Sequence, residues 1–336
     1  MPRICILPRA TATGGVSSFQ DKLTRCLAQR GIDSTFRLDE GPCDAVLLTS
    51  TSREFAGLLR LRRQGVPIVQ RLDGINWLHH RLPTGGRHFL RAEYGNRLLA
   101  LLRARVVSHI IYQSEFVRGW WRDRFGAERV PTSVIHNGVD LDTYAPEGPH
   151  ARPSDRLRLL LVEGSLQGGY ETGLQTALEL AEGLAAQFPL ELAVAGKVAP
   201  ALQRSVEASA RVPLHWAGLL PRAEIPALDR SAHLLYSADL NAACPNSVIE
   251  ALACGLPVTG FATGALPELV SGDAGRLAPY GGDPWKLEPP DLPALVKAAA
   301  QILKAPERFR SAARRRAVEA FDLERMVDRY LEILLG

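Results

Sequence analysis

The sequence predicts an α/β protein built from two parallel-sheet domains, and three observations support this. Its 336 residues are about twice the ~150 at which a single hydrophobic core tends to divide. Short apolar runs rich in branched residues alternate with helical patterns, as parallel strands alternate with crossover helices. Residues 145–155 interrupt this alternation with three prolines and no apolar periodicity, which is typical of an interdomain linker. We therefore expect domains over 1–150 and 151–321.

The expected strands form one set on each side of that linker. The first set covers residues 3–7, 45–49, 67–72, 109–113 and 133–135. The second set covers residues 157–162, 190–195, 215–217, 233–237 and 257–261. In the last segment, 322–336, hydrophobic residues recur at helical spacing, namely Met326, Val327, Tyr330, Leu331 and Leu334. This spacing predicts an amphipathic closing helix.

Composition excludes several classes of protein. Hydrophobic residues make up 46% and charged residues 23% of the chain, which is typical of globular proteins and unlike disordered ones. The longest stretch without a charged residue, 251–267, contains three glycines and two prolines and is shorter than the ~20 apolar residues of a spanning helix. Only five uncharged residues separate Arg3 from Arg9, too few for a secretory signal. We expect a cytoplasmic protein.

No metal-binding pattern stands out in the sequence. The five cysteines are odd in number and scattered, so we expect reduced thiols in or near the cores. His79 and His80 have no third ligand at a useful spacing. Asp140 and Asp142 form an Asp-x-Asp pair, but the pair belongs to a turn before the linker. We therefore expect neither a metal nor another cofactor.

Positive charge is concentrated in the first half of the chain. The net charge is +4, but residues 1–150 carry 21 Lys and Arg against 14 Asp and Glu, so that half is +7 and the rest is −3. Nine arginines lie between Arg81 and Arg124. They predict either a surface for an anionic acceptor or membrane, or simply a solvated arginine-rich face. No nucleic-acid-binding motif accompanies them, so we do not expect a nucleic-acid partner.

Two segments have the features of anion-binding helix starts. Gly14 and Gly15 follow the first strand and lead into a helical pattern, so this loop is either a phosphate or substrate loop or a structural turn. The stronger signal is the segment 244–258. There Asn246 or Ser247 can cap a helix whose first N–H groups bind anions, and Glu250, one turn later, can reach paired hydroxyls.

That segment, together with His-Asn-Gly-Val-Asp at 136–140, resembles the family 4 retaining glycosyltransferases. The resemblance extends over nearly the whole chain as six ordered elements: the Gly14–Gly15 loop, the strand before Ser114, the segment 136–140, the strand ending at Gly218, the segment 246–258, and the run with Gly264, Pro267 and Glu268. It implies the GT-B type of fold, in which two Rossmann-like, doubly wound parallel-sheet domains face an interdomain cleft. It also implies that the final helix, from about Asp322, crosses back onto the N-terminal domain.

The resemblance also implies an activity and a donor site. The activity is metal-independent, retaining transfer of a sugar from a nucleoside-diphosphate sugar to an acceptor on the N-terminal domain, which is a glycan, a lipid or a small molecule. Glu250 would hold the ribose hydroxyls. The N–H groups around Asn246, Ser247 and Val248 would face the diphosphate. The backbone near Leu219 and Leu220 would lie beside the base.

Three positions depart from the family pattern. The residue at the sugar-contacting Glu position is Ala242, and Asn241 or Asp239 could contact a sugar hydroxyl instead. The Arg and Lys pair is absent from the loop at 163–170, which includes Gly164 and Ser165. Backbone N–H groups of Gly164, Gly168 and Gly169 could form an anion nest there. Lys197, after the next strand, could add a positive charge or could be a solvated loop residue.

The third departure places Asp73 where the family has a histidine near the sugar. Asp73 follows an apolar strand and is our candidate catalytic residue; its alternative role is to cap the turn at Gly74. The three losses together would also fit a catalytically decayed glycosyltransferase-like protein that acts as a binding or regulatory subunit. Retention of Glu250 and of the segment 246–257 argues against that alternative.

Overall fold

The computed structural model describes residues 1–11 and 14–336 and divides into two compact units. Unit 1 comprises Met1–Gly138 and Leu323–Gly336, and unit 2 comprises Val139–Asp322. The division thus precedes the expected boundary at 150. The segment expected to be a linker lies instead against unit 2, where the Arg230 guanidinium donates to the carbonyls of Ala145 and Pro149 at 3.1 and 3.3 Å.

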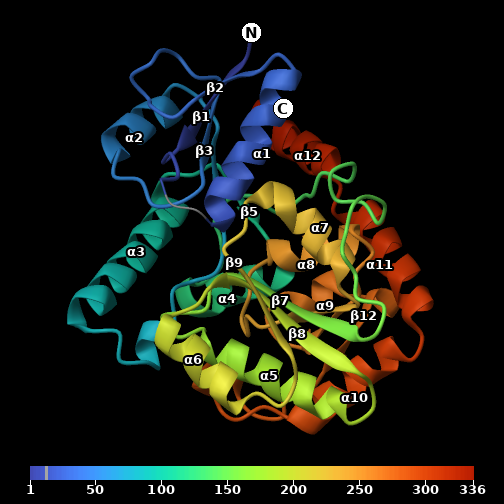
Figure 1. Ribbon diagram of the computed structural model, residues 1–336. Coiled ribbons are helices and arrows are strands. Elements are labelled where there is room, and N and C mark those ends of the chain that lie inside the picture. The colour runs from blue at the N-terminus through green and yellow to red at the C-terminus, as the bar shows by residue number, and fades with distance from the viewer. Residues whose placement is uncertain (12–13) are drawn as a thin grey trace. The chain divides into compact units, whose positions relative to one another are not determined.

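Unit 1 contains a six-stranded parallel sheet in the order β2-β1-β3-β4-β5-β6 (Figure 1). Its strands are β1 (Arg3–Leu7), β2 (Asp33–Thr35), β3 (Ala45–Leu48), β4 (Ile68–Leu72), β5 (His109–Tyr112) and β6 (Thr132–Val134). Its helices are α1 (Gly15–Gln29), α2 (Phe55–Arg63), η1 (Leu78–His80), α3 (Gly86–Arg105), α4 (Glu115–Phe125) and α12 (Leu323–Leu335). Strands β3 and β4 are buried along their whole length, because helices cover both faces of such a sheet.

The helix α12 completes the core of unit 1 rather than that of unit 2. Met326, Val327 and Tyr330 are buried in one cluster with residues of β1, α1 and β4, and the Tyr330 ring lies 5.2 Å from that of Phe19. The expected apolar side of the helix is therefore the packed side. Gly138 admits this approach, because a Cβ at that position would lie 2.8 Å from the Cα of Leu323.

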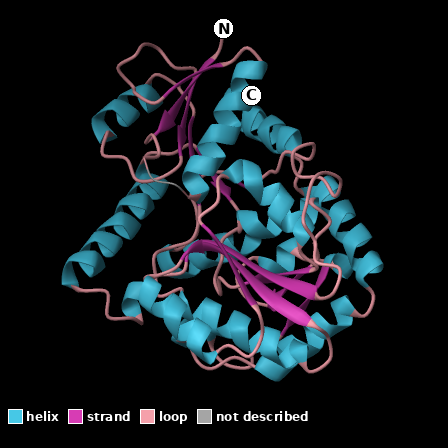
Figure 2. Cartoon of the chain, in the orientation of Figure 1, coloured by secondary structure: helices cyan, strands magenta, loops and turns pink. Residues whose placement is uncertain are grey.

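Unit 2 contains a second six-stranded parallel sheet in the order β12-β11-β10-β7-β8-β9. Figure 2 draws its strands in magenta. Its strands are β7 (Leu157–Ser165), β8 (Leu190–Lys197), β9 (Leu214–Gly218), β10 (Leu234–Ser237), β11 (Val258–Phe261) and β12 (Gly275–Ala278). Its helices are α5 (Glu171–Ala185), α6 (Pro200–Ser209), α7 (Ile225–Ser231), α8 (Asn246–Ala253), α9 (Leu266–Leu269), α10 (Leu292–Leu303) and α11 (Pro306–Ala320), with short η2 (Arg222–Glu224), η3 (Gly272–Ala274) and η4 (Pro284–Lys286).

The alternation of side chains along β7 explains why unit 2 has two cores. Leu159 and Leu161 belong to a cluster that contains residues of α5 and α10. Leu160, between them, belongs to a cluster that contains residues of α8 and α11. Successive strand residues point to opposite faces, so helices cover the sheet on both sides, as in doubly wound folds.

Three further expectations concern the chain as a whole. All five cysteines are buried and none is in a disulfide. The Asp140 carboxylate accepts from the backbone N–H groups of Asp142 and Thr143 at 3.2 and 3.1 Å, so it holds a turn as expected. Within the part of the chain that the structure describes, no helix combines the length and the apolar character that a membrane span requires.

Candidate functional site

The carboxyl ends of the unit 2 strands bring several predicted residues together. Ser165, at the end of β7, lies in register with Lys197, at the end of β8, and the N–H of Leu166 donates to the Lys197 carbonyl at 2.9 Å. Both Lys197 and the neighbouring Gly164 are exposed. Lys197 therefore lies at the carboxyl end of the sheet, the edge outside which ligands of open α/β sheets bind.

Two carboxyl groups and a phenol form an acidic cluster at this edge of the sheet. Burial raises the pKa of Glu163 to about 8, and the charge of Asp239 adds to the effect. Burial raises the pKa of Asp239 to about 6, although the N–H of Asn241 partly offsets this. Burial and both carboxyl charges raise the pKa of Tyr170 to about 12. Sequence reasoning did not select Glu163, although a carboxylate at the end of a buried strand was the available signal.

The backbone around Glu163 leaves no room for a side chain on the adjacent strand. A Cβ at Gly196 would lie 2.1 Å from the Glu163 carbonyl oxygen, and Gly196 has φ +143°. Only glycine fits this close approach. The end of β8, and with it Lys197, is therefore held directly against the Glu163 backbone.

The raised pKa of Glu163 makes stability depend on pH. The folded chain retains a proton that the unfolded chain releases near its ordinary pKa of 4.5, so the free energy of unfolding should fall as the pH rises from there through about 8. We expect the Tm to decrease over this range and the slope to flatten in Glu163→Gln. Thermal melts at several pH values measure this, with Glu179→Gln on the exposed side of α5 as the matched control. An unchanged slope in Glu163→Gln would contradict the assignment.

The expected anion nest is partly filled by the chain's own carboxylate. The N–H groups of Gly168 and Gly169 donate to the Glu171 carboxylate at 2.9 and 2.7 Å. Burial would raise the pKa of Glu171, but these backbone donors and its own N–H lower it overall. These two N–H groups, expected to face a diphosphate, therefore bind a side chain of the same loop.

Helix α8 begins differently from the prediction. Pro245 occupies the N-cap position, no side chain caps the helix, and Asn246 is already its first residue. The prediction that Asn246 or Ser247 caps the helix was wrong, because a proline before the helix fixes the backbone without needing a side-chain acceptor. The helix ends as predicted, with Gly255 at φ +67°.

Glu250 lies in a negatively charged neighbourhood within unit 2. It is half-buried on α8. Burial and then the charge of Glu250 raise the pKa of Asp229 well above its usual range. Both effects also raise the pKa of Tyr144. One carboxylate oxygen of Asp229, Oδ2, is buried without a hydrogen-bond partner in the described part of the chain.

The loop after β10 places a buried donor where the sugar-contacting glutamate is missing. Ala242 is buried, and its carbonyl accepts from the N–H of Ala265 at 2.9 Å. Gly264 lies so close to Ala242 that a Cβ there would be 2.7 Å from the Ala242 nitrogen. Next to it, Asn241 is 5% exposed, and its Nδ2 has no partner among the described residues.

Two more predicted positions lie at the end of β9. Leu219 is 66% exposed, and Leu220 packs partly against the core beside α8. Gly218 before them has φ +68°, a conformation that turns the chain out of the strand and favours glycine.

In unit 1, the predicted residues follow β1 and β4. Gly14 precedes α1 and its carbonyl accepts from the N–H of Ser18 at 3.0 Å, while Gly15 is the first helical residue. Asp73 directly follows β4 and is half-buried. Burial raises the pKa of Asp73, and the positive charge of Arg71 offsets part of this rise.

The segment after Asp73 is fastened to neighbouring helices. The indole N–H of Trp121 donates to the Asp73 carbonyl at 2.8 Å. The Asn96 side chain, on α3, accepts from the Asn76 N–H at 3.1 Å and donates to the Asn76 carbonyl at 2.9 Å. This paired bonding fixes the backbone on the carboxyl side of β4.

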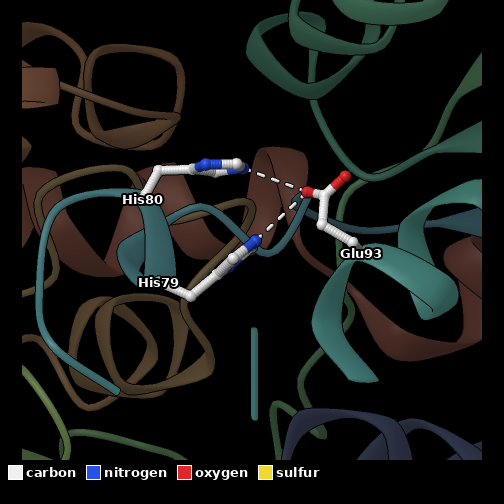
Figure 3. A group of neighbouring side chains, drawn as sticks. All are labelled: His79, His80 and Glu93. Atoms are coloured by element: carbon white, nitrogen blue, oxygen red, sulfur yellow. Dashed lines mark hydrogen bonds and ion pairs between the residues drawn. The ribbon is translucent and has the colours of Figure 1, made fainter. Parts of the chain in front are cut away.

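A third contact to α3 is made by His79 and His80, for which no third metal ligand was found from the sequence. Figure 3 shows the rings of His79 and His80, from η1, directed at the Glu93 carboxylate of α3. The Nε2 atoms lie 3.1 and 3.0 Å from the same oxygen, Oε1. Glu93 was missed because it lies beyond a loop on the following helix, at no fixed motif spacing.

The nine arginines do not form a single exposed cluster. The Arg103 guanidinium is buried and donates to the Tyr112 hydroxyl at 3.0 Å and to the Gly126 carbonyl at 2.7 Å, with Glu128 at 3.3 Å. Arg122 also pairs with Glu128, at 2.9 Å. The remaining charge is concentrated on α3, whose exposed residues include Arg87, Leu90, Arg91, Tyr94, Arg97, Leu101 and Arg105.

Comparison with known proteins places both units in one family. Residues 158–305 match the family described as Glycosyl transferases group 1, and residues 35–143 match the one described as Glycosyltransferase Family 4. A GDP-mannose-dependent alpha-(1-6)-phosphatidylinositol dimannoside mannosyltransferase of Mycobacterium tuberculosis is 25% identical over 255 residues. That match covers 74% of this chain but 63% of the relative, so the chain spans less than two thirds of the relative's length.

Solved structures agree with this fold over the whole chain. Sucrose-phosphate synthase from Thermosynechococcus elongatus superposes with a TM-score of 0.74 at 17% identity, covering 99% of this chain and 98% of that one. The Anabaena protein HepE, in complex with UDP and glucose, gives a TM-score of 0.69 at 16% identity and covers 99% of both chains. The chain therefore belongs to the family 4 glycosyltransferases and has their GT-B fold of two Rossmann-like domains.

Proposed function

We propose that the protein transfers a sugar from a nucleoside-diphosphate sugar to an acceptor, with retention of anomeric configuration and without a metal at the diphosphate. Unit 2 binds the donor and unit 1 binds the acceptor. The observation that carries the proposal is the meeting of Ser165 and Lys197 at the carboxyl edge of the unit 2 sheet. This gives a diphosphate a cation and backbone donors in the unit that also holds α8 and Glu250.

In this reaction the bond between the anomeric carbon and the diphosphate oxygen breaks as the acceptor oxygen bonds to the same carbon. The developing charge on the diphosphate is stabilised by the first N–H groups of α8, at Ser247 and Val248, and by the Lys197 ammonium. The Gly164 N–H adds a further donor. Glu250 accepts from the ribose hydroxyls, while the base lies against the backbone at Leu219 and Leu220.

The donor sugar is held by the loop after β10. The buried Nδ2 of Asn241 has no partner among the described residues, and leaving a buried donor unsatisfied costs about 1–3 kcal/mol. A sugar hydroxyl that accepts from Asn241 removes that cost. Asp239, two residues earlier, accepts from a second hydroxyl. It thereby takes the role of the family's sugar-contacting glutamate, whose position is occupied here by Ala242.

The acceptor side uses Asp73 and the loop at Gly14 and Gly15. Asp73 orients the acceptor hydroxyl, takes up its proton, or holds a hydroxyl of the donor sugar. Burial raises its pKa above that of an ordinary carboxyl group, a shift that favours proton uptake. Gly14 and Gly15, at the start of α1, provide N–H groups for an anionic part of the acceptor.

The direct test is calorimetry with a panel of nucleoside diphosphates, followed by an assay for hydrolysis of the matching nucleotide sugar. We expect one nucleotide to bind and its sugar conjugate to be turned over. Binding without turnover for any sugar or acceptor would favour the decayed binding subunit, for which the occupied nest at Glu171 is the supporting observation. No binding of any nucleotide would contradict both functions.

We further propose that the acceptor is presented at an anionic membrane surface on the cytoplasmic side. At 100° per residue, Arg87, Leu90, Arg91, Tyr94, Arg97, Leu101 and Arg105 share one exposed side of α3. Arginines mixed with large apolar side chains on one helix face are suited to a membrane interface. The mycobacterial relative is named for a phosphatidylinositol dimannoside, and this supports a lipid acceptor.

This proposal predicts salt-dependent binding to vesicles. Each arginine near an anionic surface contributes about 1 kcal/mol, so Arg87→Gln should weaken binding about fivefold. Sedimentation with vesicles containing phosphatidylserine measures this at low salt and at several hundred millimolar salt, where screening shortens the range of the attraction. Arg60→Gln on α2 removes the same charge elsewhere in unit 1. Absence of binding at low salt would exclude the membrane surface.

A further inference from the structure

We propose that His79, His80 and Glu93 form a binding site for a divalent transition-metal ion of the zinc class. Two imidazole nitrogens and one carboxylate are a donor set typical of zinc, with a fourth position open to water or another ligand. The site lies within unit 1 and is separate from the donor residues of unit 2. Its existence does not depend on the proposed glycosyl transfer.

The three donor atoms lie close to the spacing that one ion requires. Both Nε2 atoms lie 3.0–3.1 Å from Glu93 Oε1, and all three donor atoms lie within 4.8 Å of one another. In a tetrahedral zinc site with bonds of about 2.0–2.1 Å, neighbouring donor atoms are about 3.3 Å apart. Binding one ion would therefore need each nitrogen to move a few tenths of an ångström away from the carboxylate oxygen. It would also need both imidazole rings to turn so that Nε2 faces the ion instead of that oxygen.

The ligands are held in place by contacts that do not involve a metal. The Phe89 ring meets the rings of His79 and His80 edge-on, at centroid distances of 5.0 and 5.3 Å. The two histidine rings lie 4.2 Å apart. One helical turn from Glu93, Asn96 holds the backbone of Asn76, three residues before His79. The segment that carries the histidines is thus already fixed to the helix that carries the carboxylate.

Burial and charge also fit a bound cation. The His79 side chain is 1% exposed and that of Glu93 is 14%, while that of His80 is 42% exposed, so the site has a buried floor and an open side through which an ion can reach it. Glu93 supplies one negative charge. The guanidinium of Arg97 lies 3.9 Å from Glu93 Oε2, but its side chain is 79% exposed, so its opposing charge is well screened by solvent.

Without a metal, the same atoms make two hydrogen bonds to one carboxylate oxygen, and each Nε2 must carry a proton to donate. Metal binding would replace both bonds by coordination of the Nε2 lone pairs and would move the remaining ring protons to Nδ1. The hydrogen-bonded site contains no metal and the coordinated site contains one ion per chain, so a metal titration distinguishes the two.

The test uses the full chain, stripped with a chelator and titrated with Co²⁺ as a spectroscopic probe and with Zn²⁺ by calorimetry. We expect one Co²⁺ per chain with visible ligand-field absorption, displaced by Zn²⁺. Loss of a residue that only hydrogen-bonds to a metal ligand lowers metal affinity about 10–100-fold. Loss of a ligand itself should cost at least as much. We therefore expect at least this weakening in each of three variants, His79→Gln, His80→Gln and Glu93→Gln. His88→Gln, exposed on α3, is the matched control and should bind as the unmodified chain does.

Absence of stoichiometric binding, or equal binding in all variants, would overturn the proposal. His79 is buried, so its variant could fail to fold, and circular dichroism checks this. The more exposed His80 can be changed with little disturbance, so His80→Gln alone keeps the proposal falsifiable. If the chain binds the metal but transfers no sugar, the metal site is supported and the proposed glycosyl transfer is contradicted.

Discussion

Replacing Asp73 with asparagine should lower turnover by about 100-fold or more, the usual scale for a group that takes part in general acid–base catalysis. The asparagine side chain would keep the shape and the turn-forming ability of the aspartate but lose the charge. The Trp121 hydrogen bond to this residue uses the backbone carbonyl, so the substitution leaves it in place. Steady-state kinetics with saturating donor, together with a thermal melt, measures the effect.

Nucleotide affinity and Tm should barely change in Asp73→Asn, because the donor residues belong to unit 2. The matched control is Asp142→Asn, which makes the same chemical change in an exposed turn. If Asp73 only caps its turn, Asp73→Asn stays active and Asp73→Ala loses about 1 kcal/mol of stability. An active Asp73→Asn enzyme would therefore overturn the catalytic role.

Replacing Glu250 with alanine should weaken nucleotide binding by one to two orders of magnitude. A carboxylate that accepts from two ribose hydroxyls makes charged hydrogen bonds, and loss of such a partner costs about 1.5–3 kcal/mol, at about 1.4 kcal/mol per factor of ten. Titration calorimetry with the nucleoside diphosphate measures the change. Glu179→Ala, on the exposed side of α5, is the matched control.

Glu250 also acts on its own unit, so folding must be checked alongside binding. Its charge helps raise the pKa of the buried Asp229, and removing it should lower that pKa. A thermal melt and circular dichroism of Glu250→Ala show whether the variant is folded. Unchanged nucleotide affinity in a well-folded Glu250→Ala would remove Glu250 from the donor site.

The central strands were predictable because burial on both faces gives a continuous apolar run. Strands such as β3, with Ala45–Leu48 fully buried, stand out from any helical pattern. The two strands that were not predicted, β2 and β12, are sheet edges of three and four residues that are only partly buried. Neither Asp33–Thr35 nor Gly275–Ala278 contains a run of branched apolar residues, so composition does not separate them from loops.

Neighbours in the candidate site were predictable where they share one segment or, like Ser165 and Lys197, follow consecutive strands. Asn246 to Glu250 lie on one helix, so their spacing along the sequence fixes their spacing in the fold. The cluster of Glu163, Asp239 and Tyr170 joins two strand ends and a loop, and Glu93 meets His79 across a loop and a helix. These contacts depend on the order of the strands and the position of the helices, which cannot be read from the spacing of residues along the sequence.

The position of α12 has a consequence for how the chain folds as it is synthesised. The strands of unit 1 leave the ribosome first, but the buried Met326, Val327 and Tyr330 of the same core are made only after the whole of unit 2. Domains generally fold as units during synthesis, so unit 2 has all its residues before unit 1 does. Until the last helix emerges, the apolar face of β1 and β4 stays uncovered and available to chaperones. A chain truncated after residue 322 should therefore contain a protease-resistant unit 2 and a protease-sensitive unit 1.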